Sequence, residues 1–257
     1  MSKDQERPNG LLLVDKGRDW TSHDVVAVVR GVIKDKHVGH GGTLDPNATG
    51  LLPILIGSAT KKVTTLHTAS KVYAARIRFG SEMTTDDAVG TVTRSAPPPT
   101  RDEAERALAG FRGVITQHPP AFAAVKVDGR RSYDRARAGE QVEPAAREVQ
   151  VLRLDVARWT ENDDLTVLVV CSSGTYVRSI ARDLGRAANS AAHLQSLRRL
   201  AVGALDVADA IGVEALRAAG REMAVSRIRA FDVELLSLDD RYMNETADKL
   251  VPKEEFS

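Results

Sequence analysis

A glycine-rich string that contains an acidic turn constrains this chain more than any other feature. Residues 38–50 read VGHGGTLDPNATG, with glycines at positions 39, 41, 42 and 50. Glycine adopts positive φ and lets the backbone approach a ligand closely, while Pro46 biases the preceding Asp45 toward an extended conformation. An isolated Asp-Pro pair is usually only a turn. The complete string instead predicts a shaped loop that holds the Asp45 carboxylate in a fixed position.

The composition indicates one large domain, or a domain with a small appendage, because the chain has 257 residues of which 42% are hydrophobic. Residues 231–257 hold eight acidic and three basic side chains, so residues 1–230 carry +6 although the whole chain carries +1. The single cysteine, Cys171, excludes an intrachain disulfide and fits a buried structural thiol better than a nucleophile. No apolar run has the ~18 residues of a membrane span and no signal peptide is present, so we expect a cytoplasmic protein.

The periodicity of apolar residues predicts strands and helices that do not follow regular βαβ repeats. Helices are predicted at 22–33, with Ser22 as the cap, and at 59–66, 100–111, 176–188 and 213–219; strands are predicted at 51–56, 73–79, 149–156 and 165–171. Thr100 and Glu103 have the spacing of a capping box, and Pro53 is expected to interrupt its strand. The order of elements favours an α+β fold with a mostly antiparallel sheet over a doubly wound fold.

The string at 38–50 resembles the signature of the bacterial tRNA pseudouridine-55 synthases, the TruB family, in which this loop carries the catalytic aspartate. Other family motifs follow in order, at similar spacings, over approximately residues 10 to 215: LLVDK at 12–16, WTSHDVV at 20–26, KVY at 71–73, PP at 119–120 leading to VKVDGR at 125–130, GTYVR at 174–178 and LRRL at 197–200. Two positions depart from the family. Gly17 replaces the proline usual after Lys16, and MTTDD at 83–87 stands where the family more often has T-D-T-x-D.

The resemblance implies the pseudouridine-synthase fold, an α+β fold in which helices flank a mixed, mainly antiparallel central sheet with a central active-site cleft. It implies a catalytic domain over residues 1–235, in which residues 117–147 form a basic loop region that contacts RNA. Family members usually carry a C-terminal PUA domain, but residues 236–257 are too few to complete one. This short acidic tail is expected to be partly disordered.

The resemblance implies an enzyme that isomerises uridine-55 in the T-arm of tRNA to pseudouridine, with Asp45, Tyr73 and Arg178 as catalytic residues. An ionised carboxylate in a water-poor cleft needs a cationic partner, for which Arg178 is the candidate. Tyr73 can stack on uracil, and its hydroxyl can accept the C5 proton. The residues alone leave a solvated arginine and a core tyrosine as alternatives. They also leave open whether Asp45 attacks C6 of the base or acts at the sugar.

The resemblance also implies a set of substrate-binding residues: His40, Thr43, Lys126, Arg130, Arg131, Tyr176, Leu197, Arg198 and Arg199. His40 is expected to fill the space that the flipped uridine leaves in its stack. Tyr176 and Leu197 are expected to line the uridine pocket. The basic side chains between 126 and 131 are expected to follow RNA phosphates in a loop that closes on the T-arm, and Arg198 and Arg199 to add phosphate contacts.

We expect a monomer whose partner is the T-arm stem-loop of tRNA, with no membrane partner and no small-molecule cofactor. No metal is expected either, because the histidines and Cys171 lack the spacing of metal ligands. The main alternative is a non-catalytic RNA-binding or tRNA-folding module with the same cleft, since a fold does not guarantee activity. The Asp45, Tyr73 and Arg178 set argues against that alternative. A hydrolase or phosphotransferase is disfavoured because no Walker loop or acidic metal cluster occurs in the sequence.

Overall fold

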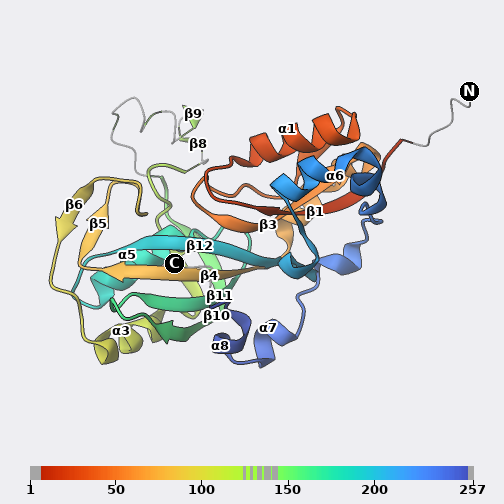
Figure 1. Ribbon diagram of the computed structural model, residues 1–257. Helices are drawn as coiled ribbons and strands as arrows, with labels where there is room; N and C mark the ends of the chain where they lie inside the picture. Colours follow the sequence, from red (N-terminus) through yellow and green to blue (C-terminus); the bar gives the residue numbers. More distant parts are fainter. Residues whose placement is uncertain are drawn as a thin grey trace, which may run out of the picture. The chain divides into compact units, whose positions relative to one another are not determined.

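The computed structural model describes residues 7–123, 126–127, 130–131, 135, 140 and 144–253, and the chain divides into two compact units. Unit 1 comprises the described residues up to Tyr73 together with Arg198–Arg241. Unit 2 comprises the described residues of Ala74–Leu197 and those from Tyr242 onward. Two strands, β4 (Lys71–Phe79) and β12 (Ala192–Val202), carry the chain from one unit to the other (Figure 1).

Unit 1 is built on a mixed set of strands centred on β3 (Thr49–Ile56). β1 (Gly10–Lys16) and β2 (Val38–His40) both pair antiparallel with β3. β12 pairs parallel with β3 through Arg198 and Arg199, the first two residues of β12 that belong to unit 1. The short strand β14 (Ile211–Gly212) lies parallel to β1, and β13 (Leu205–Asp206) pairs antiparallel with β12. Because side chains alternate along a strand, β1 and β3 present apolar residues to both faces.

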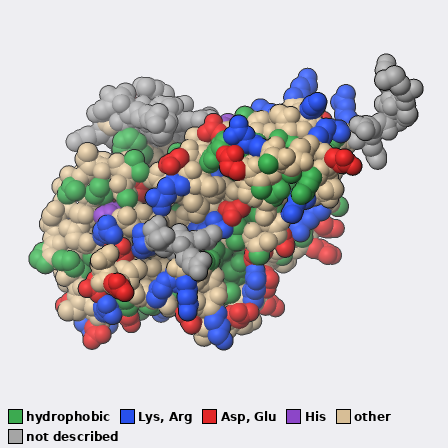
Figure 2. All heavy atoms as spheres, viewed as in Figure 1, with side chains coloured by type: hydrophobic (Ala, Val, Ile, Leu, Met, Phe, Trp, Pro, Cys, Tyr) green, Lys and Arg blue, Asp and Glu red, His purple; other side chains and the backbone are tan. Residues whose placement is uncertain are grey.

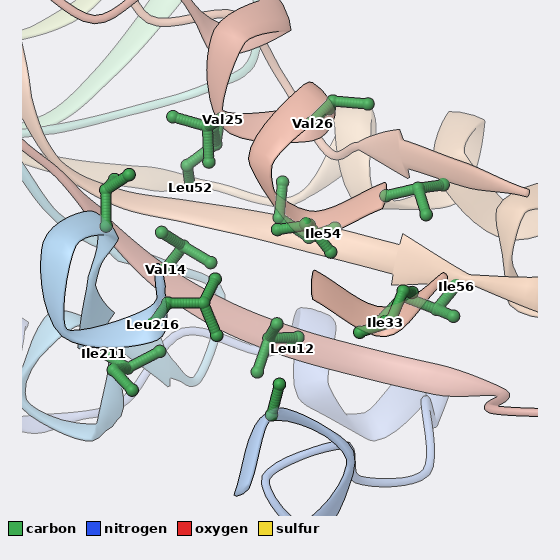
Figure 3. Packing of buried hydrophobic residues seen from close by; sticks show 14 residues of the cluster. Leu12, Val14, Val25, Val26, Ile33, Leu52, Ile54, Ile56, Ile211 and Leu216 are labelled. Atoms are coloured by element: carbon green, nitrogen blue, oxygen red, sulfur yellow. The ribbon is translucent and has the colours of Figure 1, made fainter. Parts of the chain in front are cut away.

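One face of β1 and β3 is covered by helices α1 (Ser22–Ile33) and α6 (Val213–Ser226) (Figures 1 and 3). Fourteen buried residues form this core, including Leu12 and Val14 from β1 and Leu52, Ile54 and Ile56 from β3. From α1, the core receives Val25, Val26, Val29 and Ile33. The apolar stripe predicted for this helix is therefore confirmed, and it anchors the segment that precedes the glycine-rich string.

The opposite face of β1 and β3 packs against short helices. Leu11, Leu13, Leu51 and Leu55 contact a layer formed by the 3₁₀ helix η1 (Gly57–Lys62), α2 (Val63–Thr68) and η4 (Val233–Leu236). The remaining 3₁₀ turn of this unit, η3 (Val207–Asp209), follows β13. β1 and β3 are thus buried on both sides, which explains why their sequences are almost continuously apolar rather than alternating.

Unit 2 contains strands in the order β4, β11 (Leu165–Cys171), β10 (Arg147–Trp159) and β7 (Gly113–Gln117), in which β10 pairs antiparallel with both β11 and β7. Its longer helices in the described part of the chain are α3 (Arg101–Leu108), extended by the 3₁₀ turn η2 (Ala109–Phe111), and α5 (Val177–Ala187). Two hairpins complete it, β5–β6 (Ser81–Met83 with Val92–Ser95) and β8–β9 (Lys126–Val127 with Arg130–Arg131). Thr100 caps α3 in the predicted box with Glu103.

Residues 241–253 differ from the expectation of a partly disordered tail. They form two short helices, α7 (Arg241–Asn244) and α8 (Ala247–Leu250). Arg153 of β10 donates to the Tyr242 carbonyl at 2.6 Å and to the Glu245 carbonyl at 2.7 Å. Arginine side chains that bind backbone carbonyls can order a segment whose acidic composition alone suggests disorder, and no sequence pattern reports such long-range bonds.

The mixed, mainly antiparallel sheet flanked by helices is confirmed, and so are the strands predicted around residues 149–156 and 165–171. Pro53 does not interrupt its strand, because β3 runs unbroken through Ile56. The predicted helix at 59–66 is instead η1 followed by α2, and the long strand β12 was not predicted. None of the helices in the described ranges combines the length and apolar character that crossing a bilayer requires.

Candidate active site

Backbone groups of the two residues that flank Asp45, Leu44 and Pro46, are fixed by hydrogen bonds. The Ser22 hydroxyl accepts from the Leu44 N–H at 2.9 Å and donates to the Leu44 carbonyl at 3.2 Å. On the other side, the Pro46 carbonyl accepts from the Lys16 ammonium at 3.1 Å and from the Asp19 N–H at 3.0 Å. Asp45 itself is only half-buried. The loop therefore holds the Asp45 backbone while leaving part of the residue accessible.

Two glycines of the loop are required by its geometry. Gly50 has φ of +100°, and a Cβ at this position would lie 2.2 Å from the backbone oxygen of Arg199. This close approach arises because Gly50 is paired with Arg199 where β3 and β12 run parallel. Gly42 has φ of +124°, which also disfavours a side chain. The glycines thus allow the loop to lie directly against β12.

Lys16 is a fully buried cation beneath the loop. Its ammonium donates to the carbonyls of Gly17, Trp20 and Pro46 at 2.8–3.1 Å. Burial lowers the pKa of Lys16 to about 8, and the nearby negative charge of Asp45 opposes that decrease. Asp45 therefore has a cationic neighbour within unit 1, which the sequence reasoning did not identify.

His40, at the end of β2, is half-buried beside the exposed His23 of α1. The two rings meet edge to face, with centroids 5.6 Å apart and planes 82° apart. Burial is the main cause that lowers the pKa of His40 to about 4, and His23 and Arg199 add to it. The imidazole is therefore neutral near pH 7, which suits stacking on bases rather than binding phosphate.

Arg198 and Arg199, which are predicted to contact phosphates, are both buried and engaged within unit 1. Arg198 forms a bidentate ion pair with Asp15 at 2.8 and 2.9 Å. Arg199 is 1% exposed and donates to the Leu51 carbonyl at 2.7 Å and to the Gly42 carbonyl at 3.1 Å. It also forms a hydrogen bond with the side chain of Tyr73. Arg199 therefore links the glycine-rich loop to the predicted catalytic tyrosine.

In unit 2, Tyr176 is positioned by the buried amide of Gln117. This amide accepts from the Tyr176 N–H at 2.8 Å and donates to the Tyr176 carbonyl at 2.9 Å. The guanidinium of Arg147 lies 4.7 Å from the centroid of the Tyr176 ring. No local sequence signal could reveal the role of Gln117, because it lies 59 residues from Tyr176 in the chain.

Arg178, in the first turn of α5, is 5% exposed and is not a solvated surface arginine. It donates to the Thr85 carbonyl at 3.0 Å and to the Phe122 carbonyl at 3.2 Å. The segment around Thr85 is itself braced, because the Thr85 hydroxyl donates to the Asp87 carboxylate at 2.6 Å. Residues 83–87, which depart from the family pattern, therefore still support the arginine through a backbone carbonyl.

The remaining predicted residues are placed as follows. Thr43 is exposed in the loop, and Leu197 is half-buried on β12. Lys126, Arg130 and Arg131 form the β8–β9 hairpin, but their side chains lie outside the described part of the chain.

In Figure 2, the visible face carries basic and acidic side chains that are interspersed rather than gathered by sign. Within the described ranges, no cluster of His, Cys, Asp or Glu has the arrangement of a metal site.

The sequence-predicted residues are therefore divided between the units. His40, Thr43, Asp45, Tyr73, Arg198 and Arg199 belong to unit 1, while Lys126, Arg130, Arg131, Tyr176, Arg178 and Leu197 belong to unit 2. Within unit 1, hydrogen bonds connect Tyr73 to the loop that carries His40 and Asp45 through Arg199. The supporting roles of Ser22 and Lys16 were missed, although both residues stand in motifs that the sequence displays.

Comparisons with known proteins show the family of this chain. The family model of the TruB family pseudouridylate synthase N-terminal domain matches residues 30–177. A protein named tRNA pseudouridine synthase B from Thermobifida fusca is 46% identical over 241 residues, covering 89% of this chain and 82% of that protein. A protein of the same name from Mycobacteroides abscessus is 50% identical over 200 residues, covering 76% of this chain and 67% of that protein.

Among solved structures, a chain of a Cbf5–Nop10–Gar1 complex is similar with a TM-score of 0.68 and 26% identity. The similarity covers 92% of this chain but only 64% of that one, so this chain spans less than two thirds of its structural relative. The fold and the family match together define a pseudouridylate synthase, an isomerase. Within that class, the chain belongs to the TruB family.

The two hydrogen bonds between Ser22 and Leu44 form a clamp on the loop, and the adjacent hydroxyls of Thr21 and Ser22 provide a test of it. Thr21 caps α1 in a box with Asp24, whereas Ser22 binds Leu44. We expect Ser22→Ala to cost about 1–3 kcal/mol, because it leaves a buried N–H without an acceptor, and to speed hydrogen exchange of the Leu44 amide. Thr21→Ala should cost about 1 kcal/mol through the lost cap and leave that amide protected. Equal exchange of Leu44 in both variants would contradict the clamp.

The buried ammonium of Lys16 should make stability depend on pH. Because the folded pKa is about 8 and the ordinary value is 10.5, the unfolded chain holds this proton more strongly. The free energy of unfolding of the wild type, relative to a Lys16→Met variant, should therefore rise as the pH increases from about 8 toward 10.5. Urea unfolding of both proteins at several pH values measures this difference. If the stability of the wild type relative to Lys16→Met fell over the same pH range, folding would raise the pKa of Lys16 and the expectation would be wrong.

Proposed function

We propose that this protein isomerises uridine-55 in the T-arm of tRNA to pseudouridine, using the Asp45 carboxylate and no cofactor. The observation that carries the proposal is the loop of Asp45, in which backbone groups of both neighbouring residues, Leu44 and Pro46, are held by buried side chains. Relatives that are 46–50% identical are named tRNA pseudouridine synthase B, which supports tRNA as the substrate class. A tRNA substrate would place the protein in the cytoplasm, where we expect it to act as a monomer.

The reaction is an isomerisation and therefore needs no external reagent. The N1–C1′ bond breaks, the uracil ring turns, and C5 bonds to C1′. C5 then loses its proton and N1 gains one, so that substrate and product have the same composition. Catalysis consists of stabilising the separated ring and sugar and of moving one proton, both of which a carboxylate and a positioned acid or base can do.

In this proposal, Asp45 acts as the ionised carboxylate, either by adding to the substrate or by stabilising positive character at C1′. A carboxylate whose backbone is clamped on both sides needs little reorganisation when the substrate arrives, which favours catalysis. Arg178 supplies the guanidinium that keeps Asp45 ionised in the closed site. Its bonds to the carbonyls of Thr85 and Phe122 leave its positive charge uncancelled, which is compatible with this role.

The other residues bind the flipped nucleotide. Tyr73 stacks on the uracil and receives the C5 proton, while Tyr176 and Leu197 line the base pocket. The neutral imidazole of His40 fills the stack that the uridine leaves, which offsets an unstacking free energy of a few kcal/mol. Thr43, exposed in the same loop, contacts the RNA. We propose residues 1–235 as the catalytic domain and residues 236–257 as an acidic tail.

RNA affinity is assigned mainly to the basic segment within residues 117–147. The β8–β9 hairpin pairs Lys126 with Arg131 and Val127 with Arg130. A hairpin that carries three basic residues in six positions can follow the phosphates of the T-arm and contribute a salt-dependent part of the affinity. The interspersed charges on the face seen in Figure 2 give no reason to place this function there.

Asp45→Asn tests the catalytic assignment. With an unmodified T-arm stem-loop, we expect the wild type to convert one uridine, and the variant to bind the RNA without detectable conversion, because the amide is neither anionic nor nucleophilic. Mapping of pseudouridine and a binding titration measure the two properties. Asp102→Asn, the same change at an exposed position of α3, is the matched control. Wild-type conversion by Asp45→Asn would refute the mechanism, and binding without conversion by the wild type would indicate the RNA-binding module.

Replacement of Arg130 and Arg131 by alanine tests the basic segment. Two lost phosphate contacts should weaken binding and reduce the slope of log K against log salt by up to about 2. The control removes two exposed charges elsewhere, with Arg106→Ala and Arg227→Ala. If the affinity of the hairpin variant equals that of the control at every salt concentration, the assignment fails.

A further inference from the structure

Arg199 is a buried cation whose partners are all uncharged in their ordinary state. It is 1% exposed, and its guanidinium binds the carbonyls of Leu51 and Gly42 and the side chain of Tyr73. None of these partners, within the described part of the chain, is a carboxylate. Burying a charge without a counter-ion is costly, so such an arrangement is retained only where the charge has a use.

The surroundings of Arg199 increase this cost. Its charge contributes to the lowered pKa of Lys16, His40 and His67, so a second buried cation, Lys16, and two basic imidazoles lie within its electrostatic reach. Arginine nevertheless remains protonated in proteins. Of its three hydrogen-bond partners, only Tyr73 can become an anion. A negative charge on the Tyr73 oxygen would therefore lower the free-energy cost of burying Arg199.

The hydrogen bond also fixes the direction of the Tyr73 oxygen. A guanidinium has donors and no acceptor, so the phenolic oxygen must accept from Arg199. The proton of the tyrosine, when present, points elsewhere. Because Arg199 is itself anchored to β3 through Leu51 and to the loop through Gly42, it connects the Tyr73 oxygen to the loop that carries Asp45.

We propose that Arg199 is a positioning residue that stabilises Tyr73 as a phenolate and orients its oxygen to take the C5 proton, a role that rests on the proposed function. In this step the C5–H bond breaks and the proton passes to the Tyr73 oxygen. The electron pair of that bond restores the C5–C6 double bond, and N1 takes up a proton from water. The Tyr73 phenol then returns its proton to water, and the phenolate re-forms beside Arg199.

The test compares two stem-loops, one with uridine and one with 5-fluorouridine at the target position. Fluorine replaces the C5 hydrogen, so the second substrate can undergo rearrangement of the glycosidic bond but has no C5 proton to lose. Disappearance of each target nucleotide, measured in nuclease digests, gives two rates. Their ratio, uridine over 5-fluorouridine, reports the proton-removal step, whereas misfolding or loop displacement lowers both rates together.

We expect Arg199→Met to lower the ratio by about 100-fold, the size of a general-base contribution, and Tyr73→Phe to do the same. The double variant should have the ratio of Tyr73→Phe alone, because Arg199 acts through the tyrosine oxygen. Arg199→Lys, which keeps a charge, should recover part of the ratio. Arg158→Met removes another arginine that donates to two carbonyls, those of Val251 and Pro252, and should leave the ratio unchanged.

An unchanged ratio in Arg199→Met would overturn the inference even if both rates fall, and so would a further decrease of the ratio in the double variant. These outcomes leave the proposed function intact, provided that the wild type converts uridine and Asp45→Asn does not. A wild type that converts neither substrate would overturn both proposals.

Discussion

The site depends on buried cations whose hydrogen-bond donors are satisfied by backbone carbonyls. Lys16 binds three carbonyls, including that of Pro46 next to Asp45, and Arg199 binds two, including that of Gly42 in the same loop. Lys71 repeats the arrangement at the end of α2, with bonds of 2.7 and 2.6 Å to the carbonyls of His67 and Ala69. Carbonyl dipoles satisfy the donors without cancelling the charge, so a net positive field remains inside unit 1.

This field suits a site that must keep its acids ionised. A carboxylate in a water-poor environment tends to become protonated, and cations that face it from beneath the loop oppose that tendency. The same field disfavours protonated histidine, in agreement with the lowered pKa of His40. Burial and the nearby positive charge of Arg199 thus account for a neutral imidazole at His40, five residues before Asp45 in the same loop.

Much of this fold could be predicted from the sequence, because the relevant signals are local. The apolar stripe of α1 and the capping box at Thr100 follow from spacing alone, and both are observed. β12 escaped prediction because the motif LRRL contains two arginines that become buried, against their usual preference for the surface. The burial of Arg198 and Arg199 could not be predicted for the same reason, since the partners that bury them lie more than 140 residues away.

The candidate site was predictable in its residue types but not in its support. The glycines, Asp45 and Pro46 predict a shaped loop. Ser22 was predicted only as a helix cap, but Thr21 caps α1 and Ser22 instead binds Leu44. Gln117 gave no signal, because a single glutamine acquires its role only when folding brings Tyr176 beside it. Long-range hydrogen bonds of single side chains leave no periodicity that a sequence could display.

Ser22 connects the loop that carries Asp45 to the hydrophobic core of unit 1. Its backbone begins helix α1, whose Val25, Val29 and Ile33 pack on β1 and β3, while its hydroxyl holds the loop. Local opening of the first helical turn must therefore release Leu44 at the same time, so that the two segments behave as one cooperative unit. Substitutions that loosen the packing beneath this helix would then impair the loop without contacting it, and selection on activity would extend to apolar positions remote from the substrate.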